Sequence, residues 1–384
     1  MIYLDNAATT ATDKKVVEAM LPYFSDIYGN PSSLHRLGRK AKAALERSRQ
    51  VVADFLSCDS REVIFTNGGT ESINLAIMGY ARKIGKGEII TSQIEHHAVL
   101  HSCDQLEKEG FKVTKLPVSS DGLLDLKAFE KALTKDTILV SIMYANNEIG
   151  TIQPIKQIAK IIAQFNNKTK ANVLFHTDAC QATGYLPMNV KNLCVDFLSL
   201  NGSKIYGPKG IGALYKREGI EIDPIIFGGG QEMGFRSGTE NVAGIVGLAK
   251  AIELIDPKEA IKETKLRDYF IKKLLEIDGV VLNGSLKKRL PNNINVSFAA
   301  VEGEAVVLRL DKEGIAASTG SACSSKSLTP SHVITALENS PERAHESIRF
   351  TIGRKTGKKD IDIALAKTKA IIKSLREISS IESK

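Results

Sequence analysis

The sequence predicts an α/β protein in which a large domain with a mostly parallel sheet is followed by a smaller α+β domain. Three observations support this prediction. Between residues 62 and 204, short and mostly apolar runs alternate with stretches of helical apolar spacing, the pattern of a parallel sheet covered on both faces. Downstream of residue 225 this alternation stops, and Pro257 marks a junction. The 384 residues, of which 43% are hydrophobic, suffice for two cores.

The first part of the chain supplies the predicted sheet. An extended stretch at residues 3–10 precedes a helix around 16–21, a loop at 29–33 and a long amphipathic helix over 41–55. Short strands are then predicted at 62–66, 88–92, 112–117, 138–143, 173–175 and 195–200. Each is short and bounded by polar or glycine-containing turns, as expected for strands that alternate with helices.

The second part predicts the smaller domain. A glycine run at 228–230 precedes a helix over 242–255, and a charged amphipathic helix follows over 258–277. Further elements are predicted at 292–298, 304–310 and 347–351, and a helix ends the chain. We expect a large domain over residues 15–256 and a small domain formed by residues 1–14 together with 257–384.

Charge and cysteine content exclude several classes of protein. Lys and Arg total 52 against 44 Asp and Glu, a net charge of +8 that is scattered along the chain, so no nucleic-acid partner is expected. Five cysteines without CxxC pairing argue against a disulfide framework or a zinc site. The first residues lack the basic and apolar regions of a signal peptide, and no apolar run could span a bilayer. A soluble cytoplasmic protein is expected, without a membrane partner.

Polar side chains follow the predicted strands at the points where the strands end. They are Thr70, His96, Asn147, Asp178, Gln181 and Lys204. Taken singly, each has an ordinary structural explanation, such as a helix cap for Thr70 or a turn for Asn147 and Asp178. The carboxyl ends of parallel strands share one edge of the sheet, where ligands bind. Together these residues therefore predict one crevice.

The predicted crevice has the chemistry that pyridoxal phosphate (PLP) requires. Lys204 can form a Schiff base with a carbonyl group, and the helix that starts at Gly69 and Thr70 offers backbone N–H groups to a phosphate. An ionised Asp178 would keep a pyridine nitrogen protonated. His96 could stack on the ring. The ring hydroxyl could be bound by two amides, Asn147 and Gln181, and a substrate carboxylate by the fork of Arg349.

The chain resembles the cysteine desulfurases of the NifS/IscS type, which are fold-type-I, PLP-dependent enzymes. The resemblance covers essentially the whole chain. Its motifs are Tyr3-Leu4-Asp5-Asn6-Ala7-Ala8-Thr9-Thr10, Gly29-Asn30-Pro31-Ser32-Ser33, Gly69-Thr70-Glu71-Ser72, Glu95-His96, Asn146-Asn147-Glu148-Ile149-Gly150, Asp178-Ala179-Cys180-Gln181, Lys204 with Gly207-Pro208-Lys209-Gly210, Arg236-Ser237-Gly238-Thr239, and Gly320-Ser321-Ala322-Cys323. Each motif is weak alone, but all of them in order are highly specific.

The resemblance implies a role for each of these residues. Lys204 would form the Schiff base with PLP and later move protons, and Cys323 would accept sulfur from L-cysteine as a persulfide, leaving L-alanine. By resemblance, His96 stacks on the ring, Asp178 pairs with its nitrogen, and Gly69 and Thr70 bind the phosphate, which Thr239 of a neighbouring subunit would also reach. Asn147 and Gln181 would contact the phenolic oxygen, and Arg349, with Asn147, the substrate.

The resemblance also implies partners. A phosphate contact from Thr239 across subunits implies a homodimer. An Fe–S scaffold protein of the IscU/NifU type is expected to accept the sulfur. No resident metal is expected, although Cys323 is a candidate transient ligand of an Fe–S cluster.

The sequence departs from the family at the Schiff-base lysine. The family has Ser-x-His-Lys there, whereas this chain has Asn201-Gly202-Ser203-Lys204. We expect the Asn201 amide and the Ser203 hydroxyl to hold the phosphate as neutral donors, with weaker cofactor retention.

Two alternatives remain at this stage. One is a selenocysteine lyase or a related β-eliminating enzyme, which a strict requirement for Cys323 would contradict. The other is a low-turnover Fe–S scaffold partner, against which the intact Lys204 argues. An ordinary aminotransferase is disfavoured because it needs no cysteine in a loop of small residues.

Overall fold

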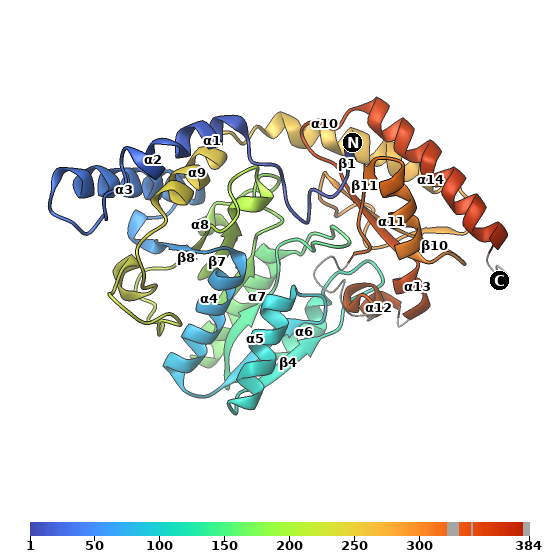
Figure 1. Cartoon of the computed structure of the whole chain (residues 1–384). Coiled ribbons are helices and arrows are strands. Elements are labelled where there is room, and N and C mark those ends of the chain that lie inside the picture. Colours follow the sequence, from blue (N-terminus) through green and yellow to red (C-terminus); the bar gives the residue numbers. More distant parts are fainter. Residues whose placement is uncertain (321–329, 339–340, 379–384) are drawn as a thin grey trace.

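A seven-stranded sheet organises the larger part of the molecule (Figure 1). The computed structural model describes residues 1–320, 330–338 and 341–378. The strand order is β2-β8-β7-β6-β5-β3-β4. The strands are β2 Val63–Thr66, β3 Glu88–Ser92, β4 Lys112–Leu116, β5 Thr137–Ser141, β6 Leu174–Asp178, β7 Phe197–Asn201 and β8 Gly212–Lys216. Only β8 runs antiparallel to its neighbours, β2 and β7, so the predicted, mostly parallel sheet is confirmed.

Successive strand residues point into two different hydrophobic clusters. Ile89 lies in the cluster on one face and Ile90 in the cluster on the other, and Leu174 and Phe175 divide in the same way. This alternation follows from the two-residue period of a strand. Helices α4 (Gly69–Ile84) and α5 (His97–Lys108) supply the first cluster. With both faces covered, the polar ends of the strands are the part of the sheet open to a ligand.

The opposite face of the sheet is covered by a larger set of helices. They are α1 Lys14–Met20, α3 Arg36–Leu56, α6 Leu126–Ala132, α7 Ile155–Thr169, α8 Val190–Leu193 and α9 Val242–Glu253. The predicted helices over 41–55 and 242–255 correspond to α3 and α9. Short elements lie between them, α2 Pro22–Ser25 and the 3₁₀ turns η1 Ser60–Glu62, η2 Gly202–Lys204 and η3 Glu232–Gly234. The strand β8 was missed in the sequence.

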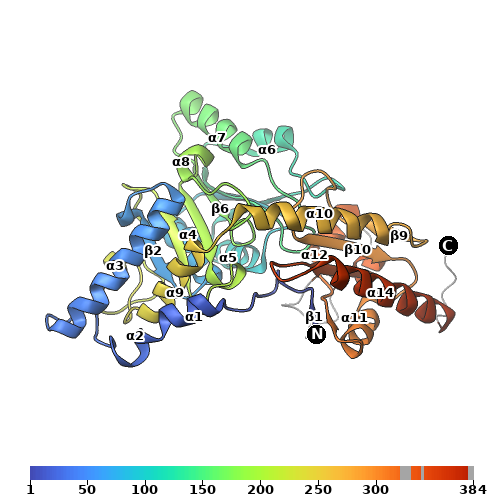
Figure 2. The ribbon, with the colours of Figure 1, turned by 90° about the horizontal axis from the view of Figure 1, so that it is seen from above.

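A third hydrophobic cluster gathers the C-terminal elements around a small sheet, in the order β12-β10-β9. These elements are β9 Val280–Leu282, β10 Asn293–Phe298, β12 Ser347–Thr351, α10 Pro257–Leu274, α11 Gly303–Lys312 and α14 Lys358–Ile378. Figure 2 shows α10 and α14 side by side. The predicted element at 304–310 is the helix α11. The division at residue 257 stays a prediction.

The N-terminus joins the C-terminal elements. β1 (Ile2–Tyr3) pairs in parallel with β11 (Ile315–Ala316), and Leu4 is fully buried in their hydrophobic cluster. The chain then crosses to the larger part, where Thr10 N donates to the carbonyl oxygen of Ser203 at 2.8 Å. This crossing brings residues 5–10 against the end of β7.

Two short helices from the C-terminal part of the chain pack on residues that follow strands of the large sheet. Helix α12 (His332–Glu338) packs on Ile94 and Ile149, which follow β3 and β5, and α13 (Pro341–His345) adds Ala344 to the same cluster. Cys323 lies outside the described residues. Among the helices of the described part of the chain, none combines the length and apolar composition that a membrane crossing needs.

Candidate active site

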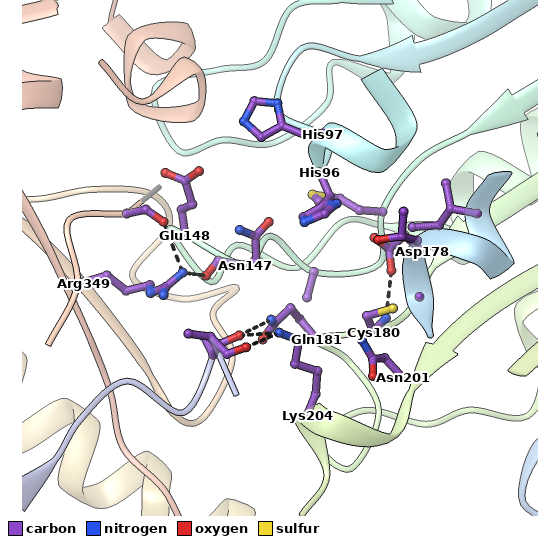
Figure 3. Close-up of a pocket in the computed structure, with 18 of the residues that line it drawn as sticks. His96, His97, Asn147, Glu148, Asp178, Cys180, Gln181, Asn201, Lys204 and Arg349 are labelled. Carbon is purple, nitrogen blue, oxygen red and sulfur yellow. Dashed lines mark hydrogen bonds between the residues drawn. The ribbon is translucent and has the colours of Figure 1, made fainter. Parts of the chain in front are cut away.

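A cavity of about 410 Å³ opens at the carboxyl ends of the central strands (Figure 3). The residues predicted from the sequence that line it are Gly69, Thr70, His96, Asn147, Asp178, Gln181, Asn201, Lys204 and Arg349. They come from both parts of the molecule, since Arg349 belongs to β12 whereas the others lie at or just after the ends of strands of the central sheet. Parallel strands bring residues distant in sequence to this one edge.

Lys204 enters the cavity from the turn that follows β7. Its Nζ donates hydrogen bonds to the carbonyl oxygens of Ala7 and Ala8, at 2.9 and 2.6 Å. Gln181 Nε2 donates to the same Ala7 oxygen at 3.0 Å. The N-terminal segment therefore forms one wall of the cavity and orients the lysine amine. Because these contacts are made by backbone carbonyls, no residue type in the sequence could have predicted them.

The first turn of α4 forms an anion cradle beside Lys204. Gly68 is the N-cap and supplies no side-chain hydrogen bond, which leaves the first N–H groups of the helix for a ligand. A Cβ at Gly69 would lie 2.6 Å from Cys180 Sγ and 3.6 Å from Asn201 Nδ2. The absence of that carbon lets an anion approach the helix terminus closely. This geometry fits a phosphate group.

Asp178, at the end of β6, is 6% exposed and lines the cavity. Its Oδ1 accepts a hydrogen bond from the backbone N–H of Cys180 at 2.9 Å. In Figure 3, Asp178 and Cys180 lie on the side of the cavity opposite Arg349. Burial and the neighbouring Asp178 raise the pKa of the Cys180 thiol well above its usual value. Asp178 is the acidic side chain that lines this end of the cavity.

His96 presents a flat ring from the N-terminus of α5. Its Nδ1 accepts the backbone N–H of Ala98 at 3.0 Å, which assigns any proton of the neutral ring to Nε2. Burial lowers the pKa of His96, so the neutral ring is favoured. The next residue, His97, lies 4.6 Å from His332 between ring centroids. Burial and His332 lower the pKa of His97 to about 4.

The side chain of Glu95, the residue before His96, links two strands of the sheet. It is fully buried and accepts hydrogen bonds from Ser92 Oγ at 2.6 Å and from Met143 N at about 3 Å. Burial raises the pKa of Glu95 to about 8. Its backbone carbonyl lies 2.9 Å from His332 Nε2. Glu95 thus ties the end of β3 to the chain that follows β5.

Arg349 lies at the opposite end of the cavity, with its side chain 3% exposed. One terminal nitrogen, Nη1, donates to the carbonyl oxygens of Asn147 and Gly320, and Nη2 pairs with Asp5 at 2.9 Å. Its Nε is buried without a hydrogen-bond partner among the described residues. An orphaned guanidinium N–H in a cavity is a donor that a ligand carboxylate can satisfy.

Among the predicted site residues that the structure describes, Ser203 and Thr239 do not line this cavity. The Ser203 hydroxyl donates to Asn201 Oδ1 at 3.0 Å, as does the Ser203 backbone N–H. Asn201 itself lines the cavity, whereas Thr239 is exposed on a loop away from it. Cys323 lies outside the described residues. The cavity also contains residues that sequence reasoning left without a role, namely Glu148 and His332.

Comparisons with known proteins show the family of the chain. The aminotransferase class-V family matches residues 2–364. The chain is 53% identical to cysteine desulfurase IscS of Dictyoglomus turgidum, over 98% of this chain and 96% of that protein. It is 50% identical to cysteine desulfurase IscS of Methanosarcina thermophila, over 100% and 95%.

Solved structures are similar over the same span. A NifS-like protein superposes with a TM-score of 0.90 at 38% identity, covering 97% of this chain and 99% of that one. SspA in complex with cysteine superposes with a TM-score of 0.82 at 39% identity, over 93% and 100%.

Proposed function

The chain belongs to the aminotransferase class-V family, and on that premise we propose that it is a PLP-dependent cysteine desulfurase, which converts L-cysteine to L-alanine and receives the sulfur on Cys323. The observation that carries the proposal is the convergence of Lys204, Asp178 and Arg349 on one cavity. Relatives named cysteine desulfurase, about half identical over nearly the whole chain, support it.

The cavity fits PLP by the chemistry of its donors. The N-terminus of α4 at Gly69 and Thr70, with the Asn201 amide, would hold the phosphate, and Asp178 the ring nitrogen. His96 would cover a ring face, and the amides of Gln181 and Asn147 would contact the phenolic oxygen. Bound PLP supplies an electron sink for the substrate carbon next to the carboxylate.

The chain's own residues account for substrate handling. Arg349 would bind the carboxylate of L-cysteine through its unsatisfied Nε and the adjoining Nη2, with Asn147 beside it, in the bidentate geometry of guanidinium and carboxylate. Lys204 Nζ, held next to the carbonyls of Ala7 and Ala8, would move the proton at substrate Cα.

Sulfur transfer requires a nucleophile, and Cys323 provides a thiol in a run of small residues. The Cys323 thiolate would attack the substrate sulfur, so that an S–S bond forms as the Cβ–S bond breaks. The electron pair of the broken bond, with a proton, stays with the three-carbon product, which leaves as alanine. Cys323 remains as a persulfide, and the reaction is balanced without an external oxidant or reductant.

We further propose that the protein has the two protein partners implied by the family resemblance, a second copy of itself and a sulfur acceptor. Thr239, exposed and outside the cavity of its own chain, would reach the phosphate site of a second copy, which requires a homodimer. An Fe–S scaffold protein of the IscU/NifU type would accept the persulfide sulfur, and Cys323 would then be a transient cluster ligand. A cytoplasmic location suits the four described cysteines, all of them free.

The test combines a visible spectrum with product analysis. The purified protein should show a PLP absorption band that is lost in Lys204→Ala. Alanine should form from L-cysteine in the wild type and not in Cys323→Ala, whose spectrum should be unchanged. Alanine formation without Cys323 would point to a lyase instead. A colourless protein that is inert with added PLP would point to a scaffold partner.

A further inference from the structure

Glu148 is a buried carboxylate on the cavity wall without a role in the proposed reaction. It is 2% exposed. Its backbone is held from two directions, since its N–H donates to Asn146 Oδ1 at 2.8 Å and its carbonyl accepts the amide groups of Asn293 and Asn295 at 3.0 and 3.1 Å. The backbone of Glu148 is therefore a fixed point between the end of β5 and strand β10.

The Glu148 side chain reaches the chain that follows residues 321–329. Its Oε2 accepts a hydrogen bond from Ser331 Oγ at 2.6 Å. Ser331 is 5% exposed, and its Oγ in turn accepts the backbone N–H of Ile334 at 3.2 Å. Ser331 is thus held by Glu148 while it caps the first turn of α12. A hydrogen bond to a buried carboxylate is among the stronger interactions of this kind.

The same carboxylate oxygen meets the chain that precedes residues 321–329. A Cβ at Gly320 would lie 2.6 Å from Glu148 Oε2, so the carboxylate in its present position leaves no room for a side chain at residue 320. Gly320 has a φ of +32°, and its carbonyl accepts Nη1 of Arg349 at 3.2 Å. One oxygen atom of Glu148 therefore contacts both Gly320 and Ser331.

We propose that Glu148 is a positioning residue for the sulfur-transfer step: one carboxylate oxygen holds Ser331 by a hydrogen bond and lies against Gly320, the two described positions between which Cys323 lies in the sequence. The proposal rests on the proposed function, because it gives Cys323 the role of nucleophile. Arg349, which would bind the substrate carboxylate, holds Gly320 from the other side. Arg349 and the two described positions on either side of residues 321–329 thereby contact the same short segment, Asn147–Glu148.

The test separates substrate binding from sulfur transfer. Glu148→Ala should slow persulfide formation on Cys323, followed by mass spectrometry in a single turnover, by about tenfold or more, since a misplacement of 1 Å can cost about 100-fold. The spectral change on adding L-cysteine, which needs Lys204 but not Cys323, should keep its wild-type rate. Ser331→Ala should likewise slow persulfide formation and leave the rate of the spectral change as in the wild type. The double variant should form the persulfide no more slowly than Glu148→Ala, because both substitutions remove one contact.

Glu148→Gln is the conservative control, since its amide oxygen can still accept the Ser331 hydroxyl and should restore most of the rate. Equal slowing of both steps, or a Gln variant as slow as the Ala variant, would overturn the proposal. Hydrogen exchange over residues 330–338 should quicken in Glu148→Ala and Ser331→Ala but not in Glu148→Gln. If the wild type makes no alanine, the proposed function fails, and this exchange comparison still decides whether Glu148 holds Ser331.

Discussion

Replacing Gly69 with alanine tests the cradle assigned to the cofactor phosphate. The added Cβ would lie 2.6 Å from Sγ of Cys180, a buried residue. Forcing a methyl group into such a contact typically costs about 1–3 kcal/mol. The higher helix propensity of alanine returns at most about 1 kcal/mol. We expect a net loss of about 1–2 kcal/mol in the free energy of unfolding, with weaker retention of PLP because the N-terminus of α4 must shift.

Urea unfolding of Gly69→Ala, Cys180→Ala and the double variant measures this contact directly. Without Sγ, the nearest atoms to the new Cβ are Asn201 Cβ and Nδ2 at 3.6 Å, an ordinary contact. The double variant should therefore recover most of the loss, with a coupling energy of about 1 kcal/mol or more. Gly357→Ala is a matched control, since its Cβ would meet Asp360 Oδ2 only at 3.5 Å. Additive effects, or a Gly69→Ala protein as stable as the wild type, would refute the steric reasoning.

Three further predictions concern other parts of the site. Arg349→Lys should lower kcat/KM for L-cysteine by about 10- to 100-fold, mainly by raising KM, because one ammonium cannot replace the bidentate guanidinium. Steady-state kinetics measure this loss, and the PLP spectrum should be unchanged. An unchanged KM would contradict the role of Arg349 in binding the carboxylate. Ser203→His should bind PLP more tightly than the wild type, because it adds a donor that can carry charge next to the phosphate, and fluorescence titration of the apoprotein measures this; equal affinities would remove the expected penalty of the Asn201–Ser203 turn. Glu95, with a pKa raised to about 8 in the folded protein from 4.5, binds its proton more tightly when folded, so its contribution to stability is complete below pH 4.5 and is lost as pH rises through 8. Glu95→Gln should remove that dependence, and thermal unfolding between pH 5 and 8 should show the variant gaining on the wild type as pH rises; parallel curves would contradict the shift.

The sequence was sufficient for the fold class and for much of the cavity. Strand periodicity placed His96, Asp178 and Lys204 just beyond strand ends, and a parallel sheet brings such ends together whatever the details of packing. The strand β8 was missed, because Gly212–Lys216 follows a turn directly and runs against its neighbours. Its five residues do not alternate between apolar and polar side chains, which is the pattern that marks a half-buried strand.

Contacts across long sequence separations required the structure. The carbonyls of Ala7 and Ala8 that orient Lys204 are backbone atoms. Every residue has them, so no residue type predicts this contact. The Ser331 contact to Glu148 joins positions 183 residues apart. Ser203 was expected to face the phosphate, yet its hydroxyl donates to Asn201, because both the hydroxyl and the N–H of Ser203 find the same Asn201 oxygen within a tight turn.

The sequence by itself therefore determined which chemistry the chain can perform and at which edge of the sheet, because both follow from local periodicity and residue type. Only the tertiary structure decided how the parts are held. It showed that Arg349 has one buried N–H with no partner in the described part of the chain, and that Glu148 contacts both Gly320 and Ser331. Such relations depend on the packing of two hydrophobic cores against each other, which no local pattern of residues encodes.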